Sequence, residues 1–323
     1  MNILNEKLAE RSAKLAKNNL FSLLGFQCQE ETKNIFKSNV NALSISIENH
    51  LANNADSRSK ILVRYNDFDS IAMTPQARSK LLDGEYIGEI LINIGLIIHL
   101  YEMFYSLDYK TFVPDEKNIE NIKMMLFYTT VNIILFHEVA HIYYQHGLLK
   151  QELMSQFGEE SPEYILDMQT LEYDADTFAI TKMYEALSSL QKSSTTAQAK
   201  LYYQIFVLSI HSLIFLFRQV DDFDIITDHP ASYIRECAML KVVNNLFGNQ
   251  NAQIYVDFAE KELNKQFNIN NNTLDSYFEK MTKFDIQLND IEKNYEKLKY
   301  SIKKYSLLPI EGVDYSDYRN LKA

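Results

Sequence analysis

Residues 124–147, MMLFYTTVNIILFHEVAHIYYQHG, decide how this chain is organised. They contain His137-Glu138-Val139-Ala140-His141, an H-E-x-x-H motif. On an α-helix two histidines four residues apart lie on one face, one turn above the other. Such a pair can share a metal ion, usually zinc, and Glu138 beside it can take a proton from a water held by the metal.

The helix that carries the motif is predicted to be buried. From Met124 to Phe136 it is almost wholly apolar, and a helix that is hydrophobic on all sides lies inside a protein. The alternative interpretation is a core helix with two satisfied histidines. A third metal ligand elsewhere in the chain decides between the two.

A candidate third ligand lies about thirty residues further on, within LEYDADTFA (residues 171–179). Residues 161–190 are predicted to form a helix, with Ser161 as the N-cap and Pro162 in the first turn. Glu172 could complete a His-His-Glu zinc site and leave the fourth position open for water. Asp176, one turn on, could accept the free N–H of a ligand imidazole and fix its orientation. A solvated acidic face is the alternative.

A third stretch, TDHPASYIR (residues 227–235), places His229 before Pro230 at a predicted helix start, with Arg235 about two turns further on. An imidazole and a guanidinium near the metal could stabilise a developing oxyanion or hold the acidic residues in place. A helix cap and a surface arginine are the alternative interpretation of this pair.

Together these motifs resemble the gluzincin metallopeptidases of the HtpX and CAAX-prenyl-protease type. In that family a further histidine often follows H-E-x-x-H, as His146 does here. In the family a second helix carries the motif E-x-[E/D]-A-D-x-x-A, and the motif H-P-x-x-x-x-R comes later in the chain. Upstream of H-E-x-x-H, residues 71–73 and 89–97 of this sequence are also similar to segments of the family. The matching motif residues are Glu172, Asp174, Ala175, Asp176, Ala179, His229, Pro230 and Arg235.

The resemblance covers about residues 69–240 and departs from the family in two respects. Flanking transmembrane helices are not evident, and the segment between Ala72 and Glu89 is longer and polar. Soluble Lit-like phage-exclusion peptidases, which also carry H-E-x-x-H, are a second group that the chain resembles.

The fold class expected is α+β and mostly α-helical: a zincin-like helical core with a small antiparallel sheet. Residues 61–65 and 89–94 are predicted strands, and residues 75–84 a short helix or a loop. The resemblance implies that strand 89–94 is an edge strand bordering the active-site cleft, where its free edge could pair with substrate. Ile90, Ile92 and Asn93 are therefore the substrate-binding candidates; an ordinary sheet strand is the alternative.

Composition limits the function classes. A net charge of −11 argues against a nucleic-acid surface or anionic lipid as partner. Two cysteines far apart, Cys28 and Cys237, indicate free thiols in a reducing cytoplasm, and the charged N-terminus is not a secretory signal. The apolar stretches 201–217 and 87–107 contain polar residues and are interpreted as core, so membrane association is not expected.

The 323 residues are predicted to divide into a zincin-like metallopeptidase domain, residues 1–250, and a helical C-terminal extension, residues 251–323, that packs on it. The metal-bearing helix is expected from about Lys117 to Gly147, with residues 151–160 as a polar connection. An apolar helix at 199–219 should pack behind it. Within the extension an amphipathic helix is predicted at 274–305, with this apolar stripe: Ile286, Ile291, Tyr295, Leu298 and Ile302.

The function predicted is that of a cytoplasmic zinc endopeptidase holding one Zn²⁺ ion per chain on His137, His141 and Glu172. Glu138 would be the general base, with His229 and Arg235 as catalytic candidates and Asp176 supporting the ligands. The partner is a protein or peptide substrate. Two alternatives stay open: a dormant Lit-like peptidase that a protein activator switches on, and a non-catalytic metal-stabilised protein-binding module.

Overall fold

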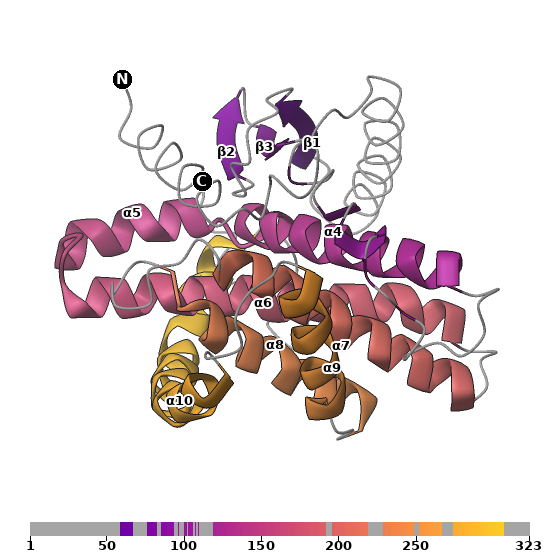
Figure 1. The fold of residues 1–323 in the computed structure, drawn as a ribbon. Helices are drawn as coiled ribbons and strands as arrows, with labels where there is room; N and C mark the ends of the chain where they lie inside the picture. The colour runs from indigo at the N-terminus through magenta and orange to yellow at the C-terminus, as the bar shows by residue number, and fades with distance from the viewer. Residues whose placement is uncertain are drawn as a thin grey trace.

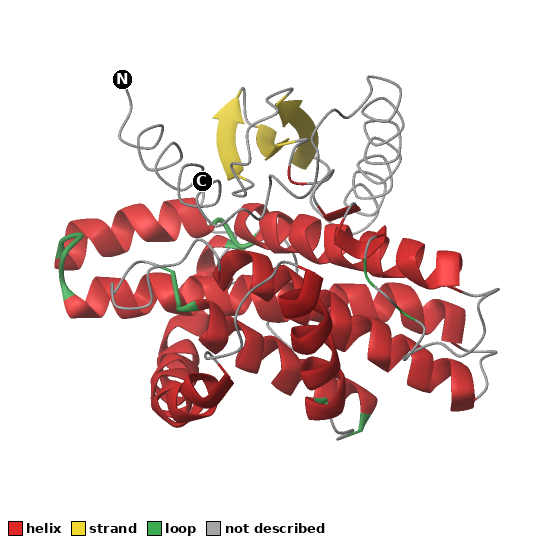
Figure 2. Cartoon of the chain, viewed as in Figure 1, coloured by secondary structure: helices red, strands yellow, loops and turns green. Residues whose placement is uncertain are grey.

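Long helices make up most of the part of the chain that the structure describes, and a small sheet lies on one side of them (Figures 1 and 2). The structure is a computed structural model that describes residues 59–66, 76–82, 85–93, single positions from 96 to 109, 119–191, 196–218, 229–248, 252–266 and 274–306. Cys28, residues 71–73 and the end of the predicted C-terminal extension, residues 307–323, lie outside this part. The elements are β1 (Ser59–Asn66), β2 (Gln76–Leu82), β3 (Glu85–Asn93), α4 (Ile119–Tyr143), α5 (His146–Phe157), α6 (Pro162–Gln191), α7 (Thr196–Arg218), α8 (Ser232–Phe247), α9 (Gln253–Gln266) and α10 (Leu274–Tyr305).

Helix α4, which carries the H-E-x-x-H motif, is the middle layer of the fold. It contacts β2 and β3 on one side and α6 and α7 on the other (Figure 1). Val131, Leu135, Val139 and Ala140 are almost fully buried in these two contacts. The prediction of a buried helix with an apolar helix packed behind it is confirmed, and the two histidines stand on a rigid internal element.

The sheet differs from the expected one in its pairing. Its strand order is β1-β3-β2, with β1 parallel and β2 antiparallel to β3. The sheet is therefore mixed rather than antiparallel, and residues 76–82 form a strand rather than a helix or loop. The expectation of a free edge on strand 89–94 was wrong, because β3 is the middle strand and hydrogen-bonds to a neighbour on each side.

The position of β3 in the sheet also argues against the predicted substrate-binding role of two of its residues. Ile90 and Ile92 are fully buried and belong to the main hydrophobic core, where no peptide could reach their side chains. Asn93 ends the strand, in register with Asn66 of β1. The strand instead supports α4: a Cβ added at Gly88 would lie 2.5 Å from Cγ2 of Ile142, so glycine permits the close approach.

The turn after the motif is tighter than predicted. Helix α4 ends at Tyr143, Gln145 adopts the left-handed conformation at φ 51°, and α5 begins at His146. Residues 146–157, which include Gly147, are helical, so the predicted helix end at Gly147 and the predicted polar connection from 151 to 157 were wrong. His146 thereby becomes the first residue of a new helix, close to the end of α4.

Helix α6 begins as predicted. Ser161 precedes it, and its hydroxyl accepts a hydrogen bond from the backbone N–H of Tyr164 at 3.1 Å, which satisfies one of the free donors of the first turn. Helix α8 begins at Ser232, two residues later than the expected Pro230. The N-terminal position of His229 relative to α8 is nevertheless kept.

A buried cluster of titratable side chains joins α7, α8 and α9. Nδ1 of His211 lies 2.6 Å from Oε1 of Glu236, and its Nε2 lies 2.9 Å from Oε2 of Glu260. His211 and Glu236 are completely buried. One imidazole between two carboxyl groups ties three helices together, and α9 also contributes Val256 and Leu263 to the main core.

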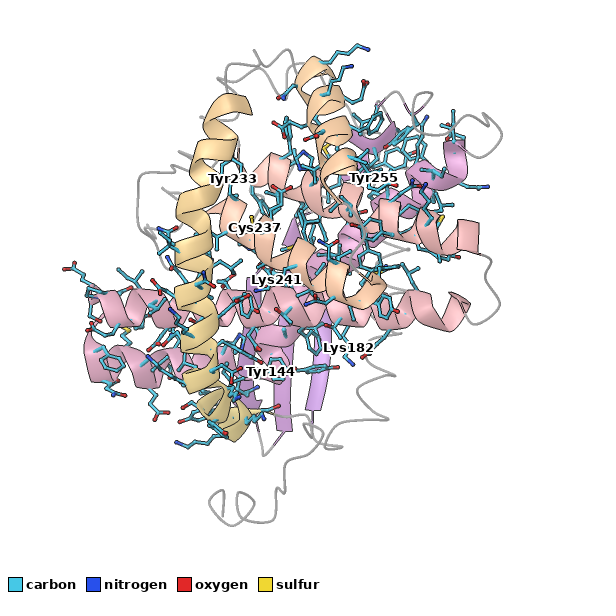
Figure 3. All side chains as sticks on the ribbon, turned by 90° about the horizontal axis from the view of Figure 1, so that it is seen from below. Tyr144, Lys182, Tyr233, Cys237, Lys241 and Tyr255 are labelled. Carbon is cyan, nitrogen blue, oxygen red and sulfur yellow. The ribbon has the colours of Figure 1, made fainter. Side chains whose placement is uncertain are left out.

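Helix α10 spans the residues predicted for it and packs on α5, α6 and α8. Seen from below, it crosses the α5–α6 pair (Figure 3). Four residues of the predicted stripe face the body, whereas Ile286 is 65% exposed. The division of the chain at residue 250 stays a prediction.

Among the described residues, two helices, α4 and residues 199–217 within α7, are long and apolar enough to cross a membrane by length and composition alone. In each, 72% of the apolar window is buried inside the protein. The core helix of a soluble protein passes the same test, so this pattern is weak support for a membrane span.

Candidate metal centre

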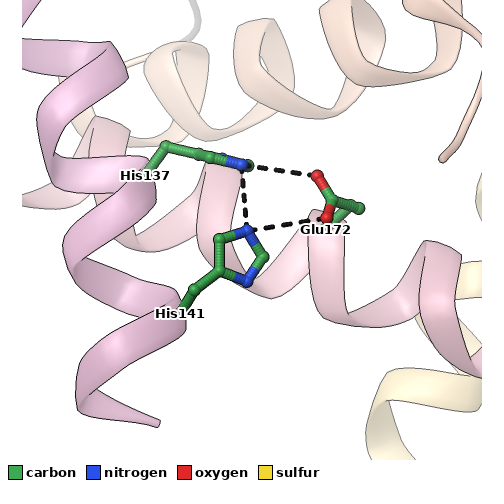
Figure 4. A group of neighbouring side chains, drawn as sticks. All are labelled: His137, His141 and Glu172. Carbon is green, nitrogen blue, oxygen red and sulfur yellow. Dashed lines mark hydrogen bonds and ion pairs between the residues drawn. The ribbon is translucent and has the colours of Figure 1, made fainter. Parts of the chain in front are cut away.

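Three side chains from two helices converge at one point. His137 and His141 project from α4, and Glu172 projects from α6 toward them (Figure 4). Nε2 of His137 lies 3.1 Å from Nε2 of His141 and 3.3 Å from Oε2 of Glu172. Oε1 of Glu172 lies 3.5 Å from Nε2 of His141. The donor atoms of this group all lie within 4.8 Å of one another, so it could hold a metal ion.

These separations fit a tetrahedral zinc ion. Ligand atoms about 2.0–2.2 Å from a tetrahedral centre lie about 3.3–3.6 Å from each other, and the three contacts lie close to this range. Two imidazole nitrogens and one carboxylate oxygen are also the donor set of catalytic zinc sites that keep an open position. The residues present therefore fit a zinc ion in both geometry and chemistry.

The ring of His137 is oriented by an acidic residue and an arginine. Its Nδ1 lies 2.8 Å from Oδ1 of Asp176, which is 1% exposed. Arg235 of α8 donates two hydrogen bonds to Asp176, from Nε at 2.8 Å and from Nη2 at 2.7 Å, and its guanidinium lies over the ring of Phe217. A proton on Nδ1 of His137, facing Asp176, leaves the lone pair of Nε2 for the metal position.

The ring of His141 is oriented through a second histidine. Its Nδ1 lies 2.9 Å from Nδ1 of His146, and Nε2 of His146 lies 3.2 Å from Oδ2 of Asp174. One proton assignment satisfies both contacts: His146 donates from Nε2 to Asp174 and accepts at Nδ1 from His141. His141 then also presents the lone pair of Nε2 to the metal position.

The electrostatics of the group favour a bound cation. Burial alone lowers the pKa of His137, but hydrogen bonds and charges from Asp176 and Glu172 outweigh it and raise this pKa to about 10. Burial holds the pKa of His141 well below its ordinary value. The two carboxylates thus keep a positive charge on His137 when no ion is bound, and a metal cation competes with that proton.

Glu138 lies beside the group and has the properties of a general base. It is 7% exposed, and burial raises the pKa of its carboxyl to about 7, against the opposing charge of His137. A base with a pKa near the working pH transfers protons efficiently in both directions.

His229 lies at the solvent-exposed rim of the group. Its Nδ1 is 3.4 Å from Oε2 of Glu172, and its side chain is 54% exposed. Burial favours the protonated form of Glu172, but His229, His141 and His137 outweigh it and hold the pKa of Glu172 well below its ordinary value. Glu172 therefore stays ionised, as a metal ligand must.

The structure brings together most of the side chains singled out in the sequence. His137, His141, Glu172, Asp176 and Arg235 form one connected network, with Glu138 and His229 beside it. The substrate candidates of β3 are not part of it. Sequence reasoning assigned no role to His146 or Asp174, although both were quoted as motif residues; only the tight turn at Gln145 brings His146 back to His141.

Comparison with known proteins gave one match. No curated protein and no solved structure matches the chain significantly. Residues 107–256 match the model of the Peptidase U49 family, a region that contains α4 to α8 and the whole network above. Of the two groups that the sequence resembles, this supports the Lit-like one. Residues 107–256 are thus a Peptidase U49 family domain, that of the Lit-like peptidases.

Proposed function

We propose that this chain is a cytoplasmic zinc endopeptidase that hydrolyses peptide bonds in a protein substrate. The family match implies a peptidase. The observation that supports the finer proposal is the convergence of His137, His141 and Glu172, whose donor atoms lie within 4.8 Å of one another. Glu138, buried beside them, has no purpose in a purely structural metal site.

Each residue of the site has its own role in the proposed hydrolysis. A zinc ion bound by the three ligands supplies Lewis acidity, which makes water nucleophilic near neutral pH and polarises a peptide carbonyl. Glu138 takes the proton from the attacking water and passes it to the leaving amine. His229, at the exposed rim, can donate a hydrogen bond to the developing oxyanion. Arg235 holds Asp176, and Asp176 holds His137, so Arg235 acts by positioning.

A peptide-library digest tests the proposal. The wild-type protein should cleave peptides, a chelator should abolish the cleavage, and added zinc should restore it. Glu138→Gln should keep its metal, measured by elemental analysis, and lose about 100- to 10,000-fold in turnover, because the general base is gone. Glu120→Gln, an exposed glutamate on the same helix that pairs with Lys123, is the matched control and should keep full activity.

Two outcomes would count against the proposal. Wild-type turnover by Glu138→Gln would remove the assignment of the base. A protein that binds zinc but cleaves nothing would favour the alternative of a metal-stabilised binding module. Cleavage that appears only when a further protein is added would favour the dormant, partner-activated version.

A further inference from the structure

The buried cluster of His211, Glu236 and Glu260 adjoins an arginine of the metal centre. Its shortest contact is the 2.6 Å hydrogen bond between Nδ1 of His211 on α7 and Oε1 of Glu236 on α8, and both side chains are completely buried. Glu236 directly follows Arg235 in α8. Consecutive residues of a helix point about 100° apart, so one of the two can face α7 while the other faces α6.

Arg235 makes the contacts that lead to the metal position. It donates to Asp176 of α6 from Nε at 2.8 Å and from Nη2 at 2.7 Å, and Oδ1 of Asp176 lies 2.8 Å from Nδ1 of His137. Its guanidinium carbon also lies 5.4 Å from the ring centroid of Phe217 on α7. Two neighbouring residues of α8 therefore link α7 to α6, and a candidate metal ligand lies at the end of this link.

We propose that His211 and Glu236 are positioning residues of the metal centre, because their buried contact fixes the rotation of α8 and so directs Arg235 at Asp176. Glu260 of α9 holds the other side of the imidazole, with Oε2 2.9 Å from Nε2 of His211. Asn264 donates to Oε1 of Glu260 at 3.2 Å and holds that carboxyl group in turn. The inference rests on the metal site of the proposed function and adds residues that support it from three further helices.

The physical reason is the difference between apolar packing and a hydrogen bond. Apolar contacts have no preferred direction, so the core side chains of α8, Met239 and Val243 among them, remain buried after a small rotation of the helix. A hydrogen bond depends on distance and angle, and breaking one in the interior is costly. The paired hydrogen bonds of Arg235 to Asp176 are equally demanding in geometry. A rotation that breaks the contact between His211 and Glu236 therefore also turns the guanidinium away from Asp176.

Zinc affinity of the full-length protein, measured by competition with a chromophoric chelator, tests the proposal without reference to catalysis. His211→Leu combined with Glu236→Met replaces the polar contact by apolar side chains of similar size, a change that buried polar pairs often tolerate. Zinc binding should weaken about tenfold, the low end of the effect for groups behind a metal ligand. In an Arg235→Leu background the same two substitutions should add nothing, because they act through Arg235.

His211→Asn separates positioning from stability. The amide of an asparagine lies near the position of Nδ1 in a histidine, so this variant keeps a polar partner for Glu236, but its side chain is too short to reach Glu260. It should unfold at a lower urea concentration than wild type and keep the wild-type zinc dissociation constant. A loss of affinity in His211→Asn as large as in the double variant would contradict the proposal, since the contact with Glu236 is retained.

Tyr203→Phe is the matched control. The hydroxyl of Tyr203 donates to Oδ1 of Asn244 at 2.7 Å and also joins α7 to α8, but farther along α8 from Arg235, so its loss should leave the zinc dissociation constant unchanged. An unchanged dissociation constant in the double variant, an equal loss in Tyr203→Phe, or a further loss in the Arg235→Leu background would each overturn the inference while the metal site stands. A wild-type protein that binds no zinc would overturn the proposed function and this inference together.

Discussion

Replacing Asp176 by asparagine tests the reasoning about the metal centre most directly. Oδ1 of Asp176 serves both Nδ1 of His137, at 2.8 Å, and Nη2 of Arg235, at 2.7 Å, and Oδ2 accepts from Nε of Arg235. An asparagine has the same shape but only one acceptor oxygen. Whichever way its amide is turned, the NH₂ group faces an N–H of Arg235, so the two donors oppose each other in a nearly closed space.

This geometry predicts how much unfolding free energy and how much zinc affinity the Asp176→Asn variant should lose. The side chain of Arg235 is 14% exposed and would lose its counter-charge, so the metal-free protein should lose about 3–5 kcal/mol of unfolding free energy. His137 would lose the carboxylate that fixes its ring, which should weaken zinc binding about 10- to 100-fold. That loss equals about 1.4–2.8 kcal/mol of binding free energy.

The stability difference should also depend on pH in a defined way. Burial alone would raise the pKa of Asp176, but Arg235 and His137 outweigh it and lower this pKa in the folded protein. A lowered carboxyl pKa contributes stability that is complete above the unfolded value of about 3.9 and is lost as the pH falls through the folded value. Because Asp176 also helps to raise the pKa of His137, the variant gains less stability than wild type as the pH falls through the unfolded histidine value. The gap between wild type and Asp176→Asn should therefore not shrink from pH 7 to about pH 4 and should shrink only below it.

Urea denaturation of the metal-free proteins at several pH values, with zinc competition at pH 7, measures both effects. Asp290→Asn is the control, since Asp290 is exposed and its contact with Lys293 on α10 is long, at 3.8 Å; it should change stability by less than about 0.5 kcal/mol. Equal stability of wild type and Asp176→Asn, or a gap that already closes between pH 7 and pH 5, would refute the reasoning.

Two further predictions concern the scaffold. Gly88→Ala should cost about 1–3 kcal/mol of unfolding free energy, because the new Cβ would lie 2.5 Å from Cγ2 of Ile142, the residue after the candidate ligand His141. Urea denaturation measures this loss. An unchanged midpoint would show that α4 and β3 can move apart at little cost. His211→Leu should cost about 3–5 kcal/mol at pH 7, because the buried Glu236 and Glu260 lose the imidazole that lies between them. Urea denaturation at pH 7 measures this loss, and an unchanged midpoint would contradict the role of His211 in joining the three helices.

Local patterns were enough to predict the helices that carry the site. A run of apolar residues made α4 a buried helix, and Ser161 with Pro162 marked the start of α6, because capping and burial depend on residues close together in the chain. The stripe on α10 likewise predicted its length and its packed face.

Pairing between strands was not predictable in the same way. The alternation of isoleucines in residues 89–94 indicates a strand, but nothing within those residues states which neighbours it has. Parallel pairing with β1 depends on chain segments more than twenty residues apart, and it made β3 the middle strand. The free edge expected for substrate was lost for that reason.

The sequence by itself determined which side chains could hold a metal, because the spacing of His137 and His141 on a helix fixes their common face whatever the helix packs against. Only the tertiary structure decided how those rings are held. Asp176 and Arg235 support one, and His146 and Asp174 support the other, and these contacts join four helices, α4, α5, α6 and α8. Hydrogen bonds between distant helices depend on how the helices pack, and that packing is a property of the whole folded chain.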